Sequence, residues 1–324
     1  MSNLDEILKK IGDIGIVPVV KIDYVKDAVL LGKALLKGRL PVAEITFRTS
    51  AAEESIKRIT DELPEMLVGA GTVLTVQQAQ SAINSGAKFI VCPGFNIPVV
   101  EFCISKGIPI TPGCSNPTDI GMALSYDLNV VKFFPAEAFG GLSTLKAISG
   151  PYGMVKFIPT GGIDIKNIND YLSFNKVLAC GGSWMVKDEL IRSGNFDEIT
   201  RLAREAVNTI LGFDLGHIGI NTIDGDTSMS AAKRLATIFD FPIKEGNSSN
   251  FIGTGIEINK SMGLGTNGHI AIKTKSLPRA ISYLERNGVE VDMSTAKGPE
   301  GGPIVAVYLK EEIGGFAIHL LQSK

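Results

Sequence analysis

The chain has 324 residues, of which 44% are hydrophobic, and its formal net charge at pH 7 is −2. A chain of this length favours two domains, and its apolar content is sufficient for sizeable cores. Because the charges nearly cancel, the composition argues against a nucleic-acid-binding protein or a protein that binds an anionic membrane surface.

The first residues, MSNLDEILKKIGDIG, are polar and acidic and do not resemble a secretory signal peptide. No apolar run reaches the ~20 residues that a membrane-spanning helix needs. The cysteines contain no CxxC pair, and we therefore expect reduced thiols in a cytoplasmic protein. They are Cys92, Cys103, Cys114 and Cys180.

Short β-rich runs alternate with helical patterns between residues 16 and 183. They recur about every 20 to 25 residues, which is typical of the βα units of a parallel sheet. Eight units in roughly 200 residues predict a (β/α)8 TIM barrel. An open doubly wound sheet is the alternative, but VVKIDYVKD lacks the glycine-rich fingerprint that usually follows the first strand of such a sheet. The eight runs are IVPVVKI, VAEITF, LVGAGTV, FIVCPG, PITPGC, VVKFFPA, KFIPTGG and VLACGGS.

The sixth run, VVKFFPA, places Lys132 within an apolar strand. A buried ammonium group costs several kcal/mol unless it is paired or neutral. In the second run, Glu44 and Arg48 share one face because side chains alternate along a strand. We expect this polar face to point into the barrel near the carboxyl ends of the strands, where Thr72 and Thr160 also lie. Lys132, Glu44 and Arg48 are therefore predicted to converge on one pocket.

A lysine, a glutamate and an arginine in one pocket are suited to chemistry on a carbonyl group. Burial of a lysine favours its neutral amine, which can attack a carbonyl and form a Schiff base. A carboxylate such as Glu44 can move protons, and Arg48 offers a bidentate fork for a substrate carboxylate. The structural alternative is a Lys132–Glu44 ion pair that fills the barrel centre. Polar residues at several strand ends favour the catalytic interpretation.

Paired glycines end the seventh and eighth runs, in PTGGI and CGGSW. Such pairs let backbone N–H groups approach an anion, and Ser183 adds a hydroxyl. This is the usual phosphate position of the barrel, although either pair alone is also explained by a tight turn.

The motifs EITFRT, GAGTVL, KFFPAEAFGG, PTGGI and GGSW resemble those of the class I 2-keto-3-deoxy-6-phosphogluconate (KDPG) and 4-hydroxy-2-oxoglutarate (KHG) aldolases, over about residues 10 to 210. The resemblance implies a TIM barrel, usually a homotrimer, that cleaves a 2-keto-4-hydroxy acid to pyruvate and an aldehyde without a cofactor. It assigns the Schiff base to Lys132 and the proton shuttle to Glu44. The other implied positions hold the pyruvyl carboxylate, form the pocket wall or face the phosphate end of the substrate: Arg48, Thr72, Pro93, Phe134, Thr160, Gly161, Gly162, Gly182 and Ser183.

An amphipathic helix, DEITRLAREAVNTI, ends near Gly212, and the pattern changes after it. GHIGINT at residues 216–222 returns as GHIAIKT at residues 268–274, with five of seven positions identical. Each copy is followed by a helical pattern and further strands. This internal repeat predicts a smaller α+β domain of paired βαβββ modules over residues 213–324, after a barrel domain over residues 1–212.

The paired modules resemble the vicinal-oxygen-chelate superfamily, which includes the glyoxalases, over about residues 214 to 322. The resemblance implies one metal ligand from the first strand and one from the last strand of each module. Imidazoles with a carboxylate suit divalent Zn, Ni, Co, Fe or Mn, so a transition metal is a candidate cofactor. Scaffold histidines without a metal are the alternative. The four implied ligands are His217, Glu257, His269 and His319.

The sequence thus favours an aldolase that acts on small 2-keto acids and binds neither nucleic acid nor a membrane. A second hypothesis is a non-catalytic barrel that binds a phosphorylated sugar acid and carries a sensor domain. A third is an isomerase or epimerase barrel, which would lack the Schiff-base lysine of the sixth strand. The preferred substrate, the identity of the metal and the pairing of the two modules within or between chains are left open.

Overall fold

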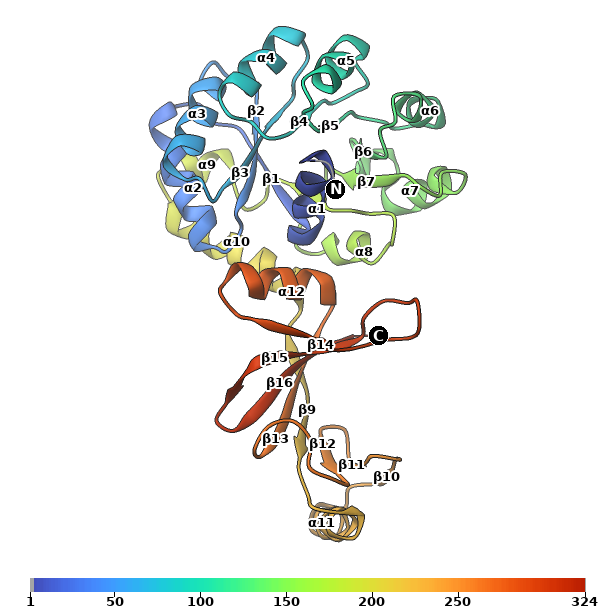
Figure 1. The fold of residues 1–324 in the computed structure, drawn as a ribbon. Helices are drawn as coiled ribbons and strands as arrows, with labels where there is room; N and C mark the ends of the chain where they lie inside the picture. The colour runs from blue at the N-terminus through green and yellow to red at the C-terminus, as the bar shows by residue number, and fades with distance from the viewer. Residues whose placement is uncertain (1–2, 324) are drawn as a thin grey trace. The chain divides into compact units, whose positions relative to one another are not determined.

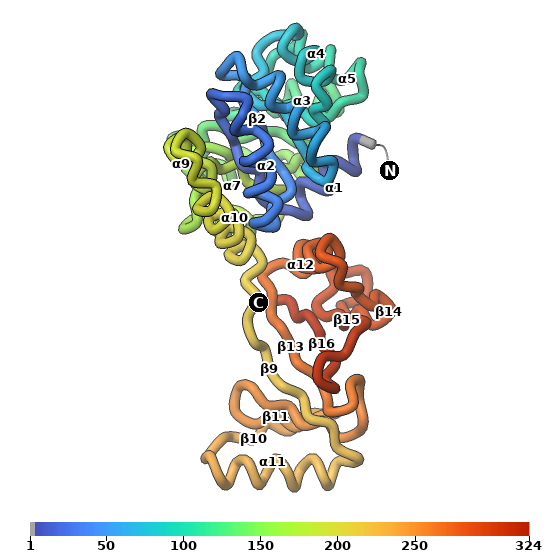
Figure 2. The backbone as a smooth tube through the Cα atoms, turned by 90° about the vertical axis from the view of Figure 1, so that its left-hand side faces the viewer, coloured from blue at the N-terminus to red at the C-terminus, as the bar shows by residue number. Residues whose placement is uncertain are grey.

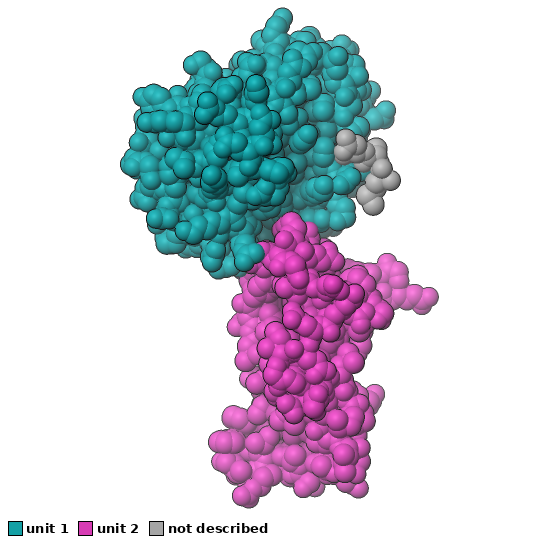
Figure 3. Space-filling model, turned by 60° about the vertical axis from the view of Figure 1, so that its left-hand side comes forward, with its two compact units in different colours: residues 1–210 teal, residues 211–324 magenta. Residues whose placement is uncertain are grey.

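The protein is described by a computed structural model that covers residues 3–323. The chain divides after Ile210 into two compact units, residues 1–210 and residues 211–324 (Figure 3). The division lies two residues before the boundary expected from the sequence. Within the described part of the chain, no helix has both the length and the apolar character needed to cross a membrane.

The first unit alternates parallel strands with helices (Figure 1). Its strands are β1 (Ile16–Val20), β2 (Val42–Thr46), β3 (Leu67–Gly71), β4 (Ile90–Val91), β5 (Ile110–Thr111), β6 (Val130–Phe133), β7 (Lys156–Pro159) and β8 (Cys180–Gly182). Its helices are α1 (Asn3–Ile14), η1 (Val25–Asp27), α2 (Ala28–Lys37), α3 (Ala52–Glu62), α4 (Val76–Asn84), α5 (Ile97–Ser105), α6 (Pro117–Ser125), η2 (Glu137–Phe139), α7 (Gly141–Ser149), α8 (Ile168–Leu172), α9 (Asp188–Arg192) and α10 (Phe196–Leu211).

The strands form a curled parallel sheet. Six of them follow the order β5-β4-β3-β2-β1-β8, and β6 pairs with β7. Single parallel bridges join Gly113 to Lys132 and Thr160 to Gly181. The expected α/β fold with one parallel strand for each of the eight runs is therefore present. Strands β4 and β5 are short because Pro93 and Pro112, which cannot donate a backbone hydrogen bond, follow them within two residues.

Helix α1 was not predicted from the sequence. Its residues Ile7 and Ile11, one helical turn apart, are buried, and Ile11 reaches the interior cavity of the sheet. Ion pairs between residues four apart, such as Lys10 with Glu6 at 2.8 Å, lie on the exposed side. This spacing was the signal that could have identified the helix.

The second unit contains one mixed sheet of eight strands, in the order β10-β11-β12-β9-β13-β16-β15-β14. The first module holds β9 (Asp214–Ile220), α11 (Gly225–Phe239), β10 (Ile243–Glu245), β11 (Ser249–Ile252) and β12 (Ile256–Asn259). The second holds β13 (Gly268–Thr274), α12 (Leu277–Arg286), β14 (Val291–Lys297), β15 (Ala306–Ile313) and β16 (Phe316–Gln322). Each module is therefore a βαβββ unit, as the repeat predicted.

The two modules pair within one chain. Their first strands, β9 and β13, lie side by side at the centre of the sheet (Figure 2). These two strands run antiparallel, and the last strand of each module lies parallel to its first. Ala232 of α11 packs with Ile252 and Ile258 in a small core on one face of the sheet. Because side chains alternate along a strand, the neighbours of these isoleucines, Phe251 and Glu257, lie on the opposite face.

Candidate functional sites

Lys132 and Glu44 meet inside the parallel sheet of the first unit. The Lys132 Nζ lies 3.4 Å from the Glu44 Oε1, and the two side chains are only 8% and 5% exposed. Both line an interior cavity together with Thr111 and Thr160. The Lys132 Nζ also lies 5.3 Å from the centre of the Phe134 ring. Lys132 and Glu44 therefore converge as predicted, and they also form the ion pair of the alternative interpretation. Arg48, the third residue predicted to converge on this pocket, is exposed and is not among the described residues that line the cavity.

Backbone hydrogen bonds fix the position of Lys132, and a neighbouring glycine leaves room for Glu44. The Lys132 N–H donates to the Pro112 carbonyl at 2.9 Å, and the Lys132 carbonyl accepts from the Cys114 N–H at 2.8 Å. A Cβ atom at Gly71 would lie 2.0 Å from the Glu44 Oε1. The second glycine of the GAGT motif thus provides the space that the Glu44 carboxylate occupies.

Arg48 and Thr72 lie just beyond the carboxyl ends of their strands. The Arg48 Nε donates to the Thr46 Oγ1 at 3.1 Å, and this hydroxyl donates to the Val20 carbonyl at 2.8 Å. Thr72 has a positive φ of 54°, which is uncommon for a threonine and fixes a sharp turn after β3. Arg48 is exposed, so its guanidinium is open to a ligand at this end of the sheet.

The glycines that follow β7 and end β8 are required by local packing. Gly161 and Gly162 have φ of 98° and 80°. A Cβ atom at Gly162 would lie 2.5 Å from the Glu137 Cβ, and one at Gly182 would lie 2.1 Å from the Trp184 ring. Turn geometry therefore explains these glycines whether or not they also face an anion. Ser183 follows β8 with an exposed side chain, and Pro93 is half-buried after β4.

Two residues of this unit were missed in the sequence analysis as candidate site residues. Thr111 of β5 is 2% exposed and faces the cavity of Lys132, and the inward position of a polar residue in PITPGC was its signal. Glu137 joins the loop after β6 to α8, because its carboxylate accepts a hydrogen bond from the Tyr171 hydroxyl. Burial, with the hydrogen bond to Glu137 second, raises the pKa of Tyr171 and keeps this hydroxyl a donor.

We expect Tyr171→Phe to lower the free energy of unfolding by about 1–2 kcal/mol, because it removes a buried donor from a carboxylate. Tyr126→Phe is the matched control, since the Tyr126 hydroxyl donates to Glu101 at 3.1 Å on the exposed surface. Urea unfolding of the two variants measures both effects. Equal stabilities for Tyr171→Phe and Tyr126→Phe would show that the Glu137–Tyr171 contact does not hold the loop.

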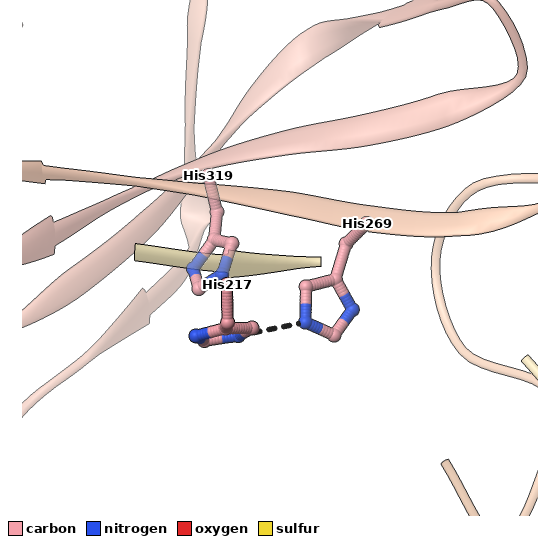
Figure 4. Close-up of side chains that lie close together, drawn as sticks. All are labelled: His217, His269 and His319. Atoms are coloured by element: carbon pink, nitrogen blue, oxygen red, sulfur yellow. Dashed lines mark hydrogen bonds between the residues drawn. The ribbon is translucent and has the colours of Figure 1, made fainter. Parts of the chain in front are cut away.

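Three side chains of the second unit converge on one point. The His217 Nε2 lies 3.0 Å from the His269 Nε2, and Figure 4 shows these two rings beside His319. The His217 Nε2 also lies 3.0 Å from the Glu257 Oε2. The His269 Nε2 lies 3.2 Å from the same oxygen. We call the sheet face that carries these residues and His319 the histidine face.

Strand register accounts for this cluster. His217 and His269 come from the paired central strands β9 and β13. Glu257 is the partner of Gly219, and His319 is the partner of Ala271. Gly219 lies two residues after His217, and Ala271 lies two residues after His269. Glu257 and His319 therefore occupy equivalent positions in the two modules. A Cβ atom at Gly219 would lie 2.1 Å from the His269 ring, which explains the glycine.

His319 completes the cluster and has no hydrogen-bond partner within the described structure. Both of its ring nitrogens are buried and unpaired. Its ring centroid lies 5.1 Å from that of His269 and 5.5 Å from that of His217. Burial, with the charges of His269 and His217 next, lowers the pKa of His319 to about 4. The ring is therefore neutral at pH 7 and can offer a lone pair.

Glu257 is the anionic member of the cluster. Burial acts to raise the pKa of Glu257, but hydrogen bonds from His217, His269 and Ser249 outweigh it and lower this pKa well below its usual range. The carboxylate is therefore ionised at pH 7. Glu257 thus adds one negative charge beside His217 and His269, and the three histidines form a group that could hold a metal ion.

The spacing of these donors fits a bound cation. If both Nε2 atoms carried hydrogens, they would repel each other at 3.0 Å. Metal bonds of ~2.1 Å at right angles place neighbouring donors ~3.0 Å apart. The distances of 3.0 to 3.2 Å among the three donors match this value. The ligand-capable atoms of the three histidines all lie within 4.8 Å of one another.

The family model described as "Aldolase: KDPG and KHG aldolase" matches residues 4–202. A 2-dehydro-3-deoxy-phosphogluconate aldolase of Haemophilus influenzae is 47% identical over 205 residues, which are 63% of this chain and 97% of the relative. A KHG/KDPG aldolase of Escherichia coli K12 is 44% identical over 192 residues, which are 59% of this chain and 90% of the relative.

Two solved structures resemble the same part of the chain. A KDPG aldolase from Legionella pneumophila, which holds pyruvate captured as a covalent carbinolamine, is 36% identical with a TM-score of 0.60 and covers 61% of this chain and 97% of its own. A 2-keto-3-deoxy-6-phosphogluconate aldolase of Zymomonas mobilis with 3-phosphoglycerate is also 36% identical, with a TM-score of 0.58 and coverage of 63% and 94%. The chain therefore belongs to the KDPG and KHG aldolase family and is a class I aldolase, a carbon–carbon lyase.

Proposed function

We propose that Lys132 forms the Schiff base and that Glu44 moves the protons of a reversible aldol cleavage. The observation that carries this assignment is the buried Lys132–Glu44 pair at 3.4 Å in a cavity that also contains Thr160. The substrates would be KDPG, cleaved to pyruvate and glyceraldehyde 3-phosphate, and KHG, cleaved to pyruvate and glyoxylate. The names of the relatives support both substrates.

The reaction follows from these two groups. The neutral Lys132 amine attacks the C2 carbonyl of the substrate, and loss of water leaves a protonated imine. Glu44 accepts the proton of the C4 hydroxyl as the C3–C4 bond breaks and the aldehyde leaves. The electron pair of that bond moves into the imine and gives an enamine. Glu44 returns the proton to C3, and water then releases pyruvate from Lys132.

The remaining predicted residues would bind the substrate. Arg48 and Thr72 would hold the pyruvyl carboxylate at the open end of the sheet, and the guanidinium can do so in a bidentate manner. Pro93 and Phe134 would form the wall of the pocket. The phosphate end would face the turns after β7 and β8: Thr160, Gly161, Gly162, Gly182 and Ser183. The exposed Ser183 hydroxyl supports this orientation.

We infer that the eight strands of this unit close into a (β/α)8 barrel, since single bridges already connect the six-stranded sheet to the β6–β7 pair. Residues 1–212 would be the aldolase domain, acting as a homotrimer. Burial raises the pKa of Cys92, Cys103 and Cys114 to about 12, which fits inert thiols in the cytoplasm.

The proton shuttle is tested with Glu44→Gln, which keeps the size of the side chain but cannot accept the proton. We expect cleavage of KDPG and KHG to slow by about 10²- to 10⁴-fold. Imine formation with pyruvate should persist, because the Lys132 amine remains. Coupled assays of pyruvate release and borohydride trapping measure the two steps separately. Unchanged cleavage in Glu44→Gln would remove Glu44 from the reaction.

For the second unit we propose a vicinal-oxygen-chelate (glyoxalase-like) domain over residues 213–324. His217, Glu257, His269 and His319 would hold a divalent transition metal. The convergent donors and the unpaired ring nitrogens of His319 support this assignment. Such an ion supplies Lewis-acid polarisation of oxygen ligands. The rival proposal of a metal-free sensor or scaffold predicts no bound metal.

A further inference from the structure

Two threonine hydroxyls tie the segment that carries Arg48 to β1 and the residues just after it. The Thr46 Oγ1 donates to the Val20 carbonyl at 2.8 Å, and the Thr49 Oγ1 donates to the Ile22 carbonyl. Thr46 is completely buried, with an exposed fraction of 0%. The backbone before Arg48 and the backbone after it are therefore both held by hydrogen bonds to the neighbouring segment.

A backbone hydrogen bond ties the same segment to β3. The Phe47 N–H donates to the Gly71 carbonyl at 2.8 Å. Gly71 directly precedes Thr72, the second residue that we propose to hold the pyruvyl carboxylate. The backbones that carry Arg48 and Thr72 are therefore fixed relative to each other. The freedom that remains lies in the long side chain of Arg48.

Thr46 also limits the freedom of this side chain. The Arg48 Nε donates to the Thr46 Oγ1 at 3.1 Å. Because the hydroxyl hydrogen of Thr46 is used for the Val20 carbonyl, the oxygen presents a lone pair to the Arg48 Nε–H. The contact leaves the terminal nitrogens Nη1 and Nη2 of Arg48 available to a ligand. An exposed arginine without such a contact samples many rotamers, which a bound ligand has to restrict at a cost in affinity.

The same contact holds the guanidinium on the side of the sheet where Lys132 and Glu44 lie. Residues two apart on a strand share a face, so Thr46 lies on the face of Glu44 in β2. Glu44 and Lys132 line the interior cavity on that face. Among residues 3–323, no carboxylate oxygen lies within 4.0 Å of the Arg48 guanidinium. The guanidinium is therefore free to pair with the carboxylate of a ligand.

We propose that Thr46 is a positioning residue for substrate recognition: its hydroxyl orients the Arg48 guanidinium so that the terminal nitrogens face the carboxylate of the pyruvyl group bound to Lys132. The inference rests on the carboxylate-binding role proposed for Arg48. Without the hydroxyl, Arg48 keeps its charge, but its side chain has to be ordered when the ligand binds. The loss therefore falls on the recognition of a charged carboxylate and leaves the Lys132 amine unchanged.

The test compares imine formation in the full chain with pyruvate and with pyruvamide, which keeps the ketone and the size of pyruvate but carries no charge. The concentration that gives half-maximal borohydride-trapped adduct on the Lys132 peptide measures the apparent affinity for each compound. We expect the unchanged chain to prefer pyruvate about 100-fold, because pyruvamide cannot accept two charge-assisted hydrogen bonds from the guanidinium. Thr46→Val, which removes the hydroxyl and keeps the branched shape, should reduce this preference about ten-fold. Thr46→Ala removes the same hydroxyl and should show the same loss.

Thr46→Ser should retain the preference for pyruvate, because serine keeps the hydroxyl. Thr49→Val is the matched control, since it removes the hydrogen bond to the Ile22 carbonyl but leaves the contact between Thr46 and Arg48. A full preference in Thr46→Val, or an equal loss in Thr49→Val, would overturn the inference and leave the role of Arg48 intact. Arg48→Met tests that role separately. If Arg48→Met kept the preference for pyruvate, Arg48 would not bind the carboxylate, and the inference about Thr46 would fail with it.

Discussion

Lys132→Met should abolish the cleavage of KDPG and KHG, with a fall in kcat of about 10⁴-fold or more. Methionine keeps the length and apolar character of the side chain, so the buried strand can still pack. It removes the amino group of Lys132 from the cavity, so no imine can form at this position. Steady-state pyruvate release from both substrates measures the loss.

Lys156→Met is the control for this variant. Lys156 begins the neighbouring strand β7, and its Nζ donates to the Asn175 carbonyl at 2.6 Å, outside the cavity. Its cleavage rates should stay within about two-fold of those of the unchanged chain. If Lys132→Met retained a tenth of the activity or more, another nucleophile would carry the reaction.

Glu257→Gln should abolish the metal binding that we propose for the second unit. The amide keeps the shape of the carboxylate but provides no negative charge against a divalent cation. Substitution of a residue that only hydrogen-bonds to a metal ligand typically weakens metal binding about 10- to 100-fold. Because Glu257 is itself a proposed ligand, we expect a larger loss of affinity in Glu257→Gln. Elemental analysis after dialysis should find about one transition metal per unchanged chain and almost none in Glu257→Gln.

Glu245→Gln is the matched control, because Glu245 forms an exposed ion pair with Lys260 at 2.9 Å in the same unit. It should retain its metal. The aldolase activity of both variants should be unchanged, since Lys132 and Glu44 belong to the other unit. An unchanged chain that stays metal-free after incubation with Zn, Ni, Co, Fe and Mn would show that the histidines are scaffold.

Much of the fold was predictable from local patterns. The eight β-rich runs became β1 to β8, and the helix expected to end near Gly212 became α10, which ends at Leu211. Family membership also sets aside the non-catalytic barrel and the isomerase. The lengths of β4 and β5 were less predictable, because pairing across a curled sheet, with prolines after each strand, decides where a short strand ends.

The candidate sites were predictable where strand alternation alone decides them. Glu44 and Lys132 followed from alternation, and His217 and His269 followed from the repeat. The Glu137–Tyr171 contact was not predictable, because it joins the segment after β6 to helix α8, which only the folded sheet brings together. The positive φ of Gly162 and its contact with Glu137 likewise depend on tertiary structure. For this reason, substitutions at Gly162 would disturb the fold before they report on phosphate binding.

The most direct test of the central claim is the capture of the Schiff base. The full chain is incubated with pyruvate, reduced with borohydride and digested, and its peptides are analysed by mass spectrometry. The account predicts one reduced pyruvyl group on the peptide that contains Lys132, and none in Lys132→Met. A reduced adduct on a different lysine, or an active enzyme that never traps pyruvate, would contradict it.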